Sequence, residues 1–205
     1  MKSLKSTCAS LTTVVFAAGL ALNFAACTSE SPLSSQQPHV TTKVVQSNIG
    51  TIRLLQVDEK ELTLMKGGGK GKDKTFKETK RIEAKKGGTI EVGNREYGKS
   101  RIIFKKKDLP EDITISFEWT AAGTFEGMLN GLEFGPHGLV FNSPVEVQLS
   151  YKKANLRGIK EKDLKLFYYN EETELWEFIG GEVDEKNKIV TGFLKHFSRY
   201  AIGAE

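Results

Sequence analysis

The residues with the most reactive side chains are few in this chain of 205 residues, and they lie far apart. The histidines are His39, His137 and His196, and no two of them have the spacing of ligands to one metal ion. Both cysteines, Cys8 and Cys27, fall at the N-terminus, so the rest of the chain can form neither a disulfide nor a thiolate metal site. The sequence therefore predicts no metal site, no cofactor and no catalytic centre that acts on another molecule.

A glycine- and lysine-rich stretch over residues 67–72 invites comparison with a phosphate-binding loop. The P-loop needs a glycine, four further residues, and then Gly-Lys-Ser/Thr. Here Lys66 stands in the place of the first glycine and Asp73 replaces the hydroxyl. We therefore expect residues 66–86, with nine basic and three acidic side chains, to be a flexible, solvated hairpin loop. A weak contact with phosphate-bearing envelope polymers is the alternative.

Residues 1–26 have the pattern of a signal peptide. Lys2 and Lys5 give a positively charged start, and an apolar stretch rich in small residues follows over residues 11–26. This stretch is shorter than a comfortable membrane span, which favours a cleaved leader over a transmembrane helix.

The leader ends in Ala25-Ala26-Cys27, which resembles the lipobox of bacterial lipoproteins, with Phe24 in the place of the usual aliphatic residue. The resemblance implies that Cys27 becomes the first mature residue and is acylated with fatty acids such as palmitate. More than one acyl chain holds a protein firmly on a membrane. Thr28 after the cysteine favours the outer membrane or the cell surface. An ordinary signal peptide with a chance cysteine is the alternative.

The remaining chain divides by composition. Residues 27–42 are rich in serine, glutamine and proline and have little to bury, so we expect a disordered tether. Residues 43–80 are predicted to hold an N-terminal hairpin, turning at residues 58–60, and the basic loop. A short amphipathic helix over residues 57–66 competes with that hairpin. Residues 81–205 are predicted to form one domain.

Alternation with a period of two dominates the last domain. Two runs place apolar residues on one face: Ile113, Ile115, Phe117 and Trp119, and Val145, Val147, Leu149 and Tyr151. Pro144 is expected at the start of the second strand, where a missing N–H matters least. Residues 164–169 are apolar on both faces, which indicates a central strand, and residues 197–202 predict the last one. Short strands separated by turn residues favour an all-β fold, an antiparallel β-sandwich.

The charge balance excludes one class of partner. The formal net charge is +4, and removing Lys2 and Lys5 from the 30 basic residues leaves 28 against 26 acidic residues. So small an excess does not indicate nucleic acid as a partner.

Two runs resemble ZU5 domains: Gly-Gly-Thr-Ile at residues 87–90, and Phe-Gly-Pro-His-Gly-Leu-Val-Phe at residues 134–141. The tail from Trp176 through residues 196–201 resembles the segment that follows in ZU5-like proteins, some of which cleave themselves. Three lysines at residues 105–107 replace the family's usual apolar Ile-Pro. The resemblance implies a β-sandwich that serves as a binding module.

In the self-cleaving relatives, the chain breaks between Phe and Ser of a His-Phe-Ser triplet, here His196, Phe197 and Ser198. On an extended strand, residues two apart share a face, so the imidazole of His196 could take the hydroxyl proton of Ser198. The oxygen of Ser198 would then attack the Phe197 carbonyl and give an ester that water opens. We favour the structural alternative, in which His196 and Ser198 bond to each other or to nearby backbone.

The larger aromatic residues are predicted to form the core rather than a sugar-stacking surface; they are Phe117, Trp119, Phe134, Trp176 and Phe178. The sequence thus predicts a lipid-anchored protein of the bacterial cell envelope. Its β-sandwich would be a non-catalytic binding or structural module for an unknown protein or glycan. Self-cleavage at Phe197–Ser198 and a glycan-binding surface module are the alternatives.

Overall fold

The computed structural model describes residues 43–57, 75–120 and 131–205, and these residues form an all-β fold made of antiparallel sheets. The prediction of an antiparallel β-sandwich is confirmed. The signal peptide, Cys27, the tether, the second arm of the first hairpin and residues 66–74 of the basic loop lie outside the described residues. No helix in the described residues has the length and apolar character needed to cross a membrane.

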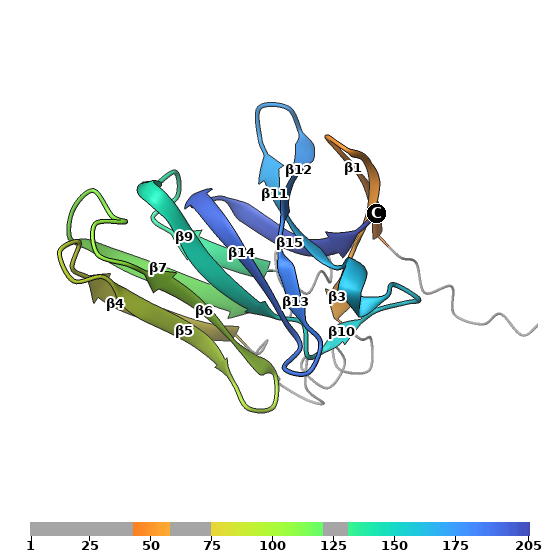
Figure 1. Ribbon diagram of the computed structural model, residues 1–205, viewed down its shortest axis with the longest axis horizontal. Helices are drawn as coiled ribbons and strands as arrows, with labels where there is room; N and C mark the ends of the chain where they lie inside the picture. Colours follow the sequence, from red (N-terminus) through yellow and green to blue (C-terminus); the bar gives the residue numbers. More distant parts are fainter. Residues whose placement is uncertain (1–42, 58–74, 121–130) are drawn as a thin grey trace, which may run out of the picture. The chain divides into compact units, whose positions relative to one another are not determined.

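One sheet is closed and has five strands in the order β1-β12-β11-β15-β2 (Figure 1). Its strands are β1 (Lys43–Ser47), β2 (Gly50–Leu54), β11 (Lys165–Asn170), β12 (Leu175–Gly180) and β15 (Arg199–Ala204). All neighbours are antiparallel except β1 and β12. Strand β11 pairs on both sides, which confirms the predicted central strand. Ile52, Phe167 and Trp176 are among the residues that fill this sheet.

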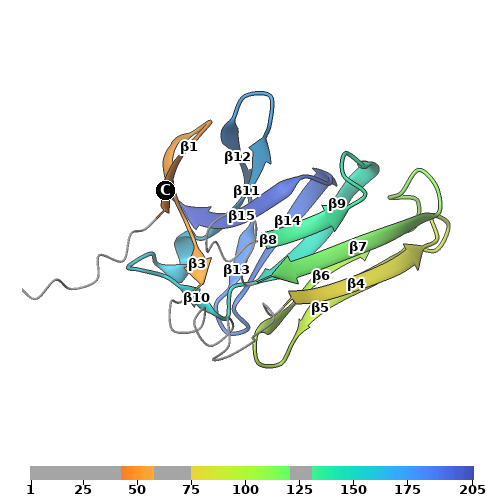
Figure 2. The ribbon, with the colours of Figure 1, turned by 180° about the vertical axis from the view of Figure 1, so that it is seen from behind.

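A second five-stranded sheet has the order β13-β14-β9-β6-β5. It consists of β5 (Gly88–Asn94), β6 (Gly98–Phe104), β9 (Val140–Ser150), β13 (Glu182–Asp184) and β14 (Ile189–His196). A three-stranded sheet contains β4 (Thr75–Ile82), β7 (Ile113–Thr120) and β8 (Gly131–Gly135). Figure 2 shows β8 between β7 and β15. A short pair, β3 (Gln56–Val57) and β10 (Ala154–Asn155), and the 3₁₀ turn η1 (Glu161–Asp163) complete the fold.

The core lies between the sheets and follows the predicted alternation. On β7, Ile115, Phe117 and Trp119 are buried, and β9 buries the predicted run from Val145 to Tyr151 in the same way. Each large apolar side chain removed from water stabilises the fold by about 1.5–3 kcal/mol. Both predicted sheet faces therefore meet in one apolar cluster.

Three local predictions were wrong. Residues 75–82, expected in a loop, form strand β4, which pairs with β7 along its whole length. Pro144 lies inside β9, at a register shift in its pairing with β14: Leu194 pairs with Val145, and the next pair is His196 with Val140. The missing N–H is tolerated there because the regular ladder is already interrupted. The last strand begins at Arg199, two residues later than expected.

Candidate functional site

His196 is the last residue of β14, and Phe197 and Ser198 connect it to β15, so the triplet does not lie inside one strand. The side chain of Phe197 is only 2% exposed. Its ring stacks on Phe134, with 5.4 Å between centroids, and meets Phe141 edge-on at 4.9 Å. The middle residue of the triplet is therefore an anchor of the core.

The backbone of Phe197 is held on both sides. Its N–H donates to the carbonyl of Leu139 at 2.9 Å, and its carbonyl accepts from the N–H of Gly138 at 3.3 Å. The hydroxyl of Ser198 donates to the carbonyl of Tyr169 at 3.2 Å. The Gly138 amide thus lies where negative charge would develop during attack on Phe197, but the Ser198 proton is directed to Tyr169 and not to the imidazole of His196.

His196 meets the ring of Tyr168 edge-on at 5.2 Å, and its carbonyl accepts a hydrogen bond from the hydroxyl of Tyr200. It lines a surface hollow of about 450 Å³ together with His137, which lies 3.7 Å from Glu133. Two histidines that are distant in the sequence therefore reach one hollow. In the part of the chain that the structure describes, no group of three or more His, Cys, Asp or Glu residues could hold a metal ion.

Beside this hollow lies a second cleft of about 340 Å³ with exposed aromatic rings at its rim. We call it the aromatic cleft, and its lining includes Tyr168, Glu177, Phe178, Phe193 and His196. Phe178 of β12 is 40% exposed and Phe193 of β14 is 54% exposed. The prediction that Phe178 belongs to the core was wrong, whereas the other predicted core aromatics are buried: Phe117, Trp119, Phe134 and Trp176.

Polar groups at the aromatic cleft are ordered by hydrogen bonds to one carboxylate. Tyr168 and Glu177 are opposite one another in the β11–β12 pair, and the Tyr168 hydroxyl donates to Glu177. Burial, with the nearby carboxylate, raises the pKa of Tyr168 to about 12. The hydrogen bonds from Tyr168 and Asn170, the latter at 2.5 Å, lower the pKa of Glu177. At neutral pH Tyr168 is therefore a neutral phenol and Glu177 a carboxylate, and both lie in one cleft with the His196 ring and two apolar rings.

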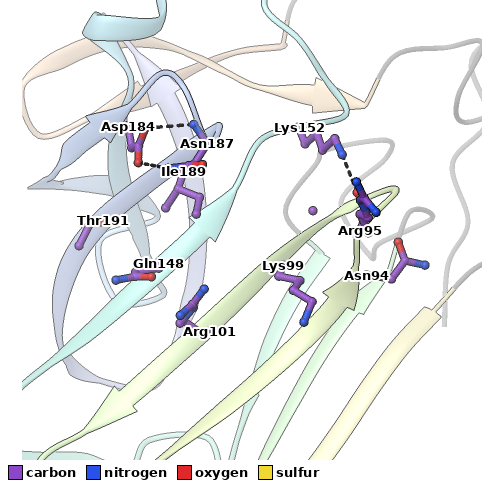
Figure 3. A pocket seen from close by; sticks show the side chains of 11 residues that line it. Asn94, Arg95, Lys99, Arg101, Gln148, Lys152, Asp184, Asn187, Ile189 and Thr191 are labelled. Atoms are coloured by element: carbon purple, nitrogen blue, oxygen red, sulfur yellow. Dashed lines mark hydrogen bonds between the residues drawn. The ribbon is translucent and has the colours of Figure 1, made fainter.

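A groove of about 480 Å³ crosses the outer face of the second five-stranded sheet (Figure 3). Its floor is a cross-strand row in which Arg101 of β6 lies opposite Gln148 of β9, and Gln148 lies opposite Thr191 of β14. Figure 3 shows the residues along one side, Asp184, Asn187, Ile189 and Thr191, and those along the other, Asn94, Arg95, Lys99 and Lys152. We call this the basic groove.

The hairpin turns at the two ends of the basic groove are held by side-chain caps. The Asn94 side-chain oxygen accepts the N–H groups of Glu96 and Tyr97, both at 2.9 Å. At the other turn, Asp184 accepts the backbone N–H of Asn187 at 3.0 Å and its side-chain N–H at 2.6 Å. These hydrogen bonds lower the pKa of Asp184. Both turns are therefore fixed before any ligand arrives.

Sequence reasoning missed both surfaces, although a weak signal for one was present. On β14 the buried positions are Val190, Gly192 and Leu194, so Phe193 stands in the polar, outward phase of the strand. A large aromatic residue in that phase indicates an exposed contact surface. The basic groove had no such signal, because its residues come from five strands, and from the turns between them, whose pairing the sequence does not give.

No family model matches the sequence. A search of characterised proteins finds an amylopullulanase from Thermoanaerobacterium thermosulfurigenes, which is 41% identical over 58 residues. The match covers 28% of this chain and 3% of the amylopullulanase, so the chain spans only a small part of that relative's length.

Proposed function

We propose that this protein is a lipid-anchored component of the bacterial cell envelope, held through acylated Cys27 at the outer membrane or cell surface. In this proposal residues 1–26 are removed and residues 27–42 tether a ZU5-like β-sandwich to the lipid. The sandwich is a non-catalytic binding module, and its ligand is a glycan.

The aromatic cleft carries the glycan assignment. Sugars offer apolar faces of C–H groups and a rim of hydroxyls, and they bind where an exposed aromatic ring lies beside fixed hydrogen-bonding groups. Phe178 and Phe193 supply the rings. Tyr168, Glu177 and His196 supply donors and acceptors within the same cleft. The partial similarity to an amylopullulanase, by its name a polysaccharide-degrading enzyme, supports a glycan over a protein partner.

Titration calorimetry of the detergent-solubilised protein against pullulan, dextran and neutral envelope polysaccharides tests the proposal. We expect at least one to bind, and Phe178→Ala combined with Phe193→Ala to weaken that binding at least about tenfold. Full burial of a Phe side chain contributes about 1.5–3 kcal/mol, so covering two half-exposed rings supplies a comparable amount, and about 1.4 kcal/mol corresponds to a factor of ten.

Ile49→Ala is the matched control, because Ile49 is 45% exposed and does not line the aromatic cleft. It should bind as tightly as the parent protein. A flat titration with every glycan, or equal affinity for the parent and the double Phe variant, would contradict the assignment.

A further inference from the structure

The basic groove and the aromatic cleft lie along the same outward face of β14. Thr191 lines the groove and Phe193 lines the cleft, and both side chains alternate with the buried Val190, Gly192 and Leu194. Residues two apart on a strand are separated by about 6.6 Å. A polymer that contacts Phe193 therefore reaches the basic groove at Thr191 if it extends by about 6.6 Å along the strand.

The charges of the basic groove are only partly compensated within the protein. Lys99 and Arg101 share a single carboxylate, that of Glu91, at 2.6 Å and 3.7 Å. The Nε atom of Arg101 is buried and has no hydrogen-bond partner. Lys152 donates its ammonium to the neutral backbone carbonyl of Arg95 at 2.5 Å. The single carboxylate of Glu91 thus pairs with two cations, Lys99 and Arg101. The ammonium of Lys152 donates to a neutral carbonyl and not to a carboxylate.

The acidic groups nearby are already engaged. Asp184, on the far side of the groove, accepts two hydrogen bonds from Asn187. Glu146, next to the floor, accepts a hydrogen bond from Gln148 at 2.8 Å. Neither carboxylate is paired with Lys99, Arg101 or Lys152, so these cations can still meet an anion on their side of the groove, and an arginine fork suits the oxygens of a carboxylate, sulfate or phosphate.

We propose that the basic groove extends the glycan site and selects chains that carry anionic substituents. The uncharged part of the chain stacks in the aromatic cleft, and its carboxylate, sulfate or phosphate group lies against Arg101, Lys99 and Lys152. This inference rests on the proposed glycan-binding function, since the cleft supplies the neighbouring contact.

Dextran and dextran sulfate separate the two claims, because they share a backbone and differ in charge. We expect dextran sulfate to bind at least ten times more tightly than dextran at 0.15 M salt. Lys99→Gln combined with Arg101→Gln should remove most of that difference and leave the affinity for dextran unchanged. Polygalacturonate and a phosphorylated dextran, titrated in the same way, identify which anionic group is preferred.

Lys77→Gln combined with Arg81→Gln is the matched control. These residues are also one Lys and one Arg on a strand surface, paired with Glu118 at 3.0 Å and Asp112 at 3.6 Å, but they belong to β4 of the three-stranded sheet and do not line the groove. The control should keep its preference for dextran sulfate. An equal loss in the control pair would mean a general charge effect and would overturn the inference.

The remaining outcomes distinguish the inference from the proposed function. If the double Phe variant loses binding while the groove variant keeps the full preference for dextran sulfate, the glycan site stands and the inference is wrong. If Lys99→Gln combined with Arg101→Gln weakens the binding of dextran sulfate, but Phe178→Ala combined with Phe193→Ala weakens the binding of no glycan, the proposed aromatic site is wrong. Binding of single-stranded DNA as tight as that of dextran sulfate would also overturn the selection of a glycan.

Discussion

At the scale of single residues, Phe197 and Ser198 determine whether the chain can cleave itself. The Phe197 ring is fixed in the core, both polar groups of its backbone are bonded to residues 138 and 139, and the Ser198 hydroxyl is bonded to Tyr169. Attack on the Phe197 carbonyl would need the hydroxyl to leave its acceptor and a base to receive its proton.

We therefore expect the purified, folded protein to keep its intact mass under denaturing conditions. Mass spectrometry after prolonged incubation at neutral pH measures this directly. Release of a peptide of residues 198–205, abolished by Ser198→Ala, would establish self-cleavage instead.

Single residues were also where sequence reasoning was least complete. Alternation predicted the burial of Phe117 and Trp119, because each lies on a strand with one clearly apolar face. It placed Phe178 in the core for the same reason. Phe178 is packed edge-on against Phe167 at 5.7 Å, yet it is 40% exposed. Alternation along a strand shows which side chains share a face, but it does not show which of them are covered by a neighbouring sheet.

At the scale of elements, η1 is fastened to the sheet by one carboxylate. Glu161 accepts hydrogen bonds from Lys188 at 2.6 Å and 2.7 Å and from the hydroxyl of Tyr151 at 2.7 Å. Tyr151 follows β9 and Lys188 precedes β14, so the 3₁₀ turn is joined to two neighbouring strands. The hydrogen bonds from Lys188 and then Tyr151 lower the pKa of Glu161.

Glu161→Gln should therefore cost about 1 kcal/mol of unfolding free energy at pH 7, a modest value because solvent screens the partly exposed Lys188. The folded state holds the proton of Glu161 less tightly than the unfolded state. The contribution is thus complete above the unfolded pKa of about 4.3 and is lost as the pH falls through the lower folded value.

Urea unfolding of both proteins between pH 7 and pH 3 measures this difference. Glu83→Gln is the control, because Glu83 pairs with Lys86 on an exposed turn and fastens no second element. A difference between parent and Glu161→Gln that stays constant across the range would refute the role of the carboxylate.

Elements with one apolar face were predictable, and those without one were not. Strand β9 was predicted from its alternation, whereas β4 was not. Six of the eight residues of β4 are exposed, and its sequence is rich in Lys, Glu and Thr. Such an edge strand owes its conformation to the ladder with β7 and not to its own side chains. The residues of the basic groove were unpredictable for a related reason: cross-strand register brings them together.

At the scale of the whole molecule, the proposed anchor makes the location depend on one sulfur atom. We expect Cys27→Ser to move the protein from the membrane fraction to the soluble fraction, because in this proposal acylation of Cys27 supplies the apolar chains that enter the bilayer. Fractionation with immunoblotting, together with labelling by a palmitate analogue, measures both effects.

Cys8→Ser is the matched control, since Cys8 lies within the predicted leader. It should leave both labelling and fractionation unchanged. Continued membrane association of Cys27→Ser, or equal loss of label in both variants, would argue for an ordinary secreted protein.

The closed sheet has a consequence for biosynthesis. Strand β15 lies between β2 and β11, and β12 completes the circuit against β1. The ribosome makes β1 and β2 long before the two strands that flank them, so the ring stays open until almost all of residues 43–205 have been translated. Contacts between such distant segments form slowly. We therefore expect the closed sheet to form late, only after β15 has been made, whereas β4 to β8 can pair with one another earlier.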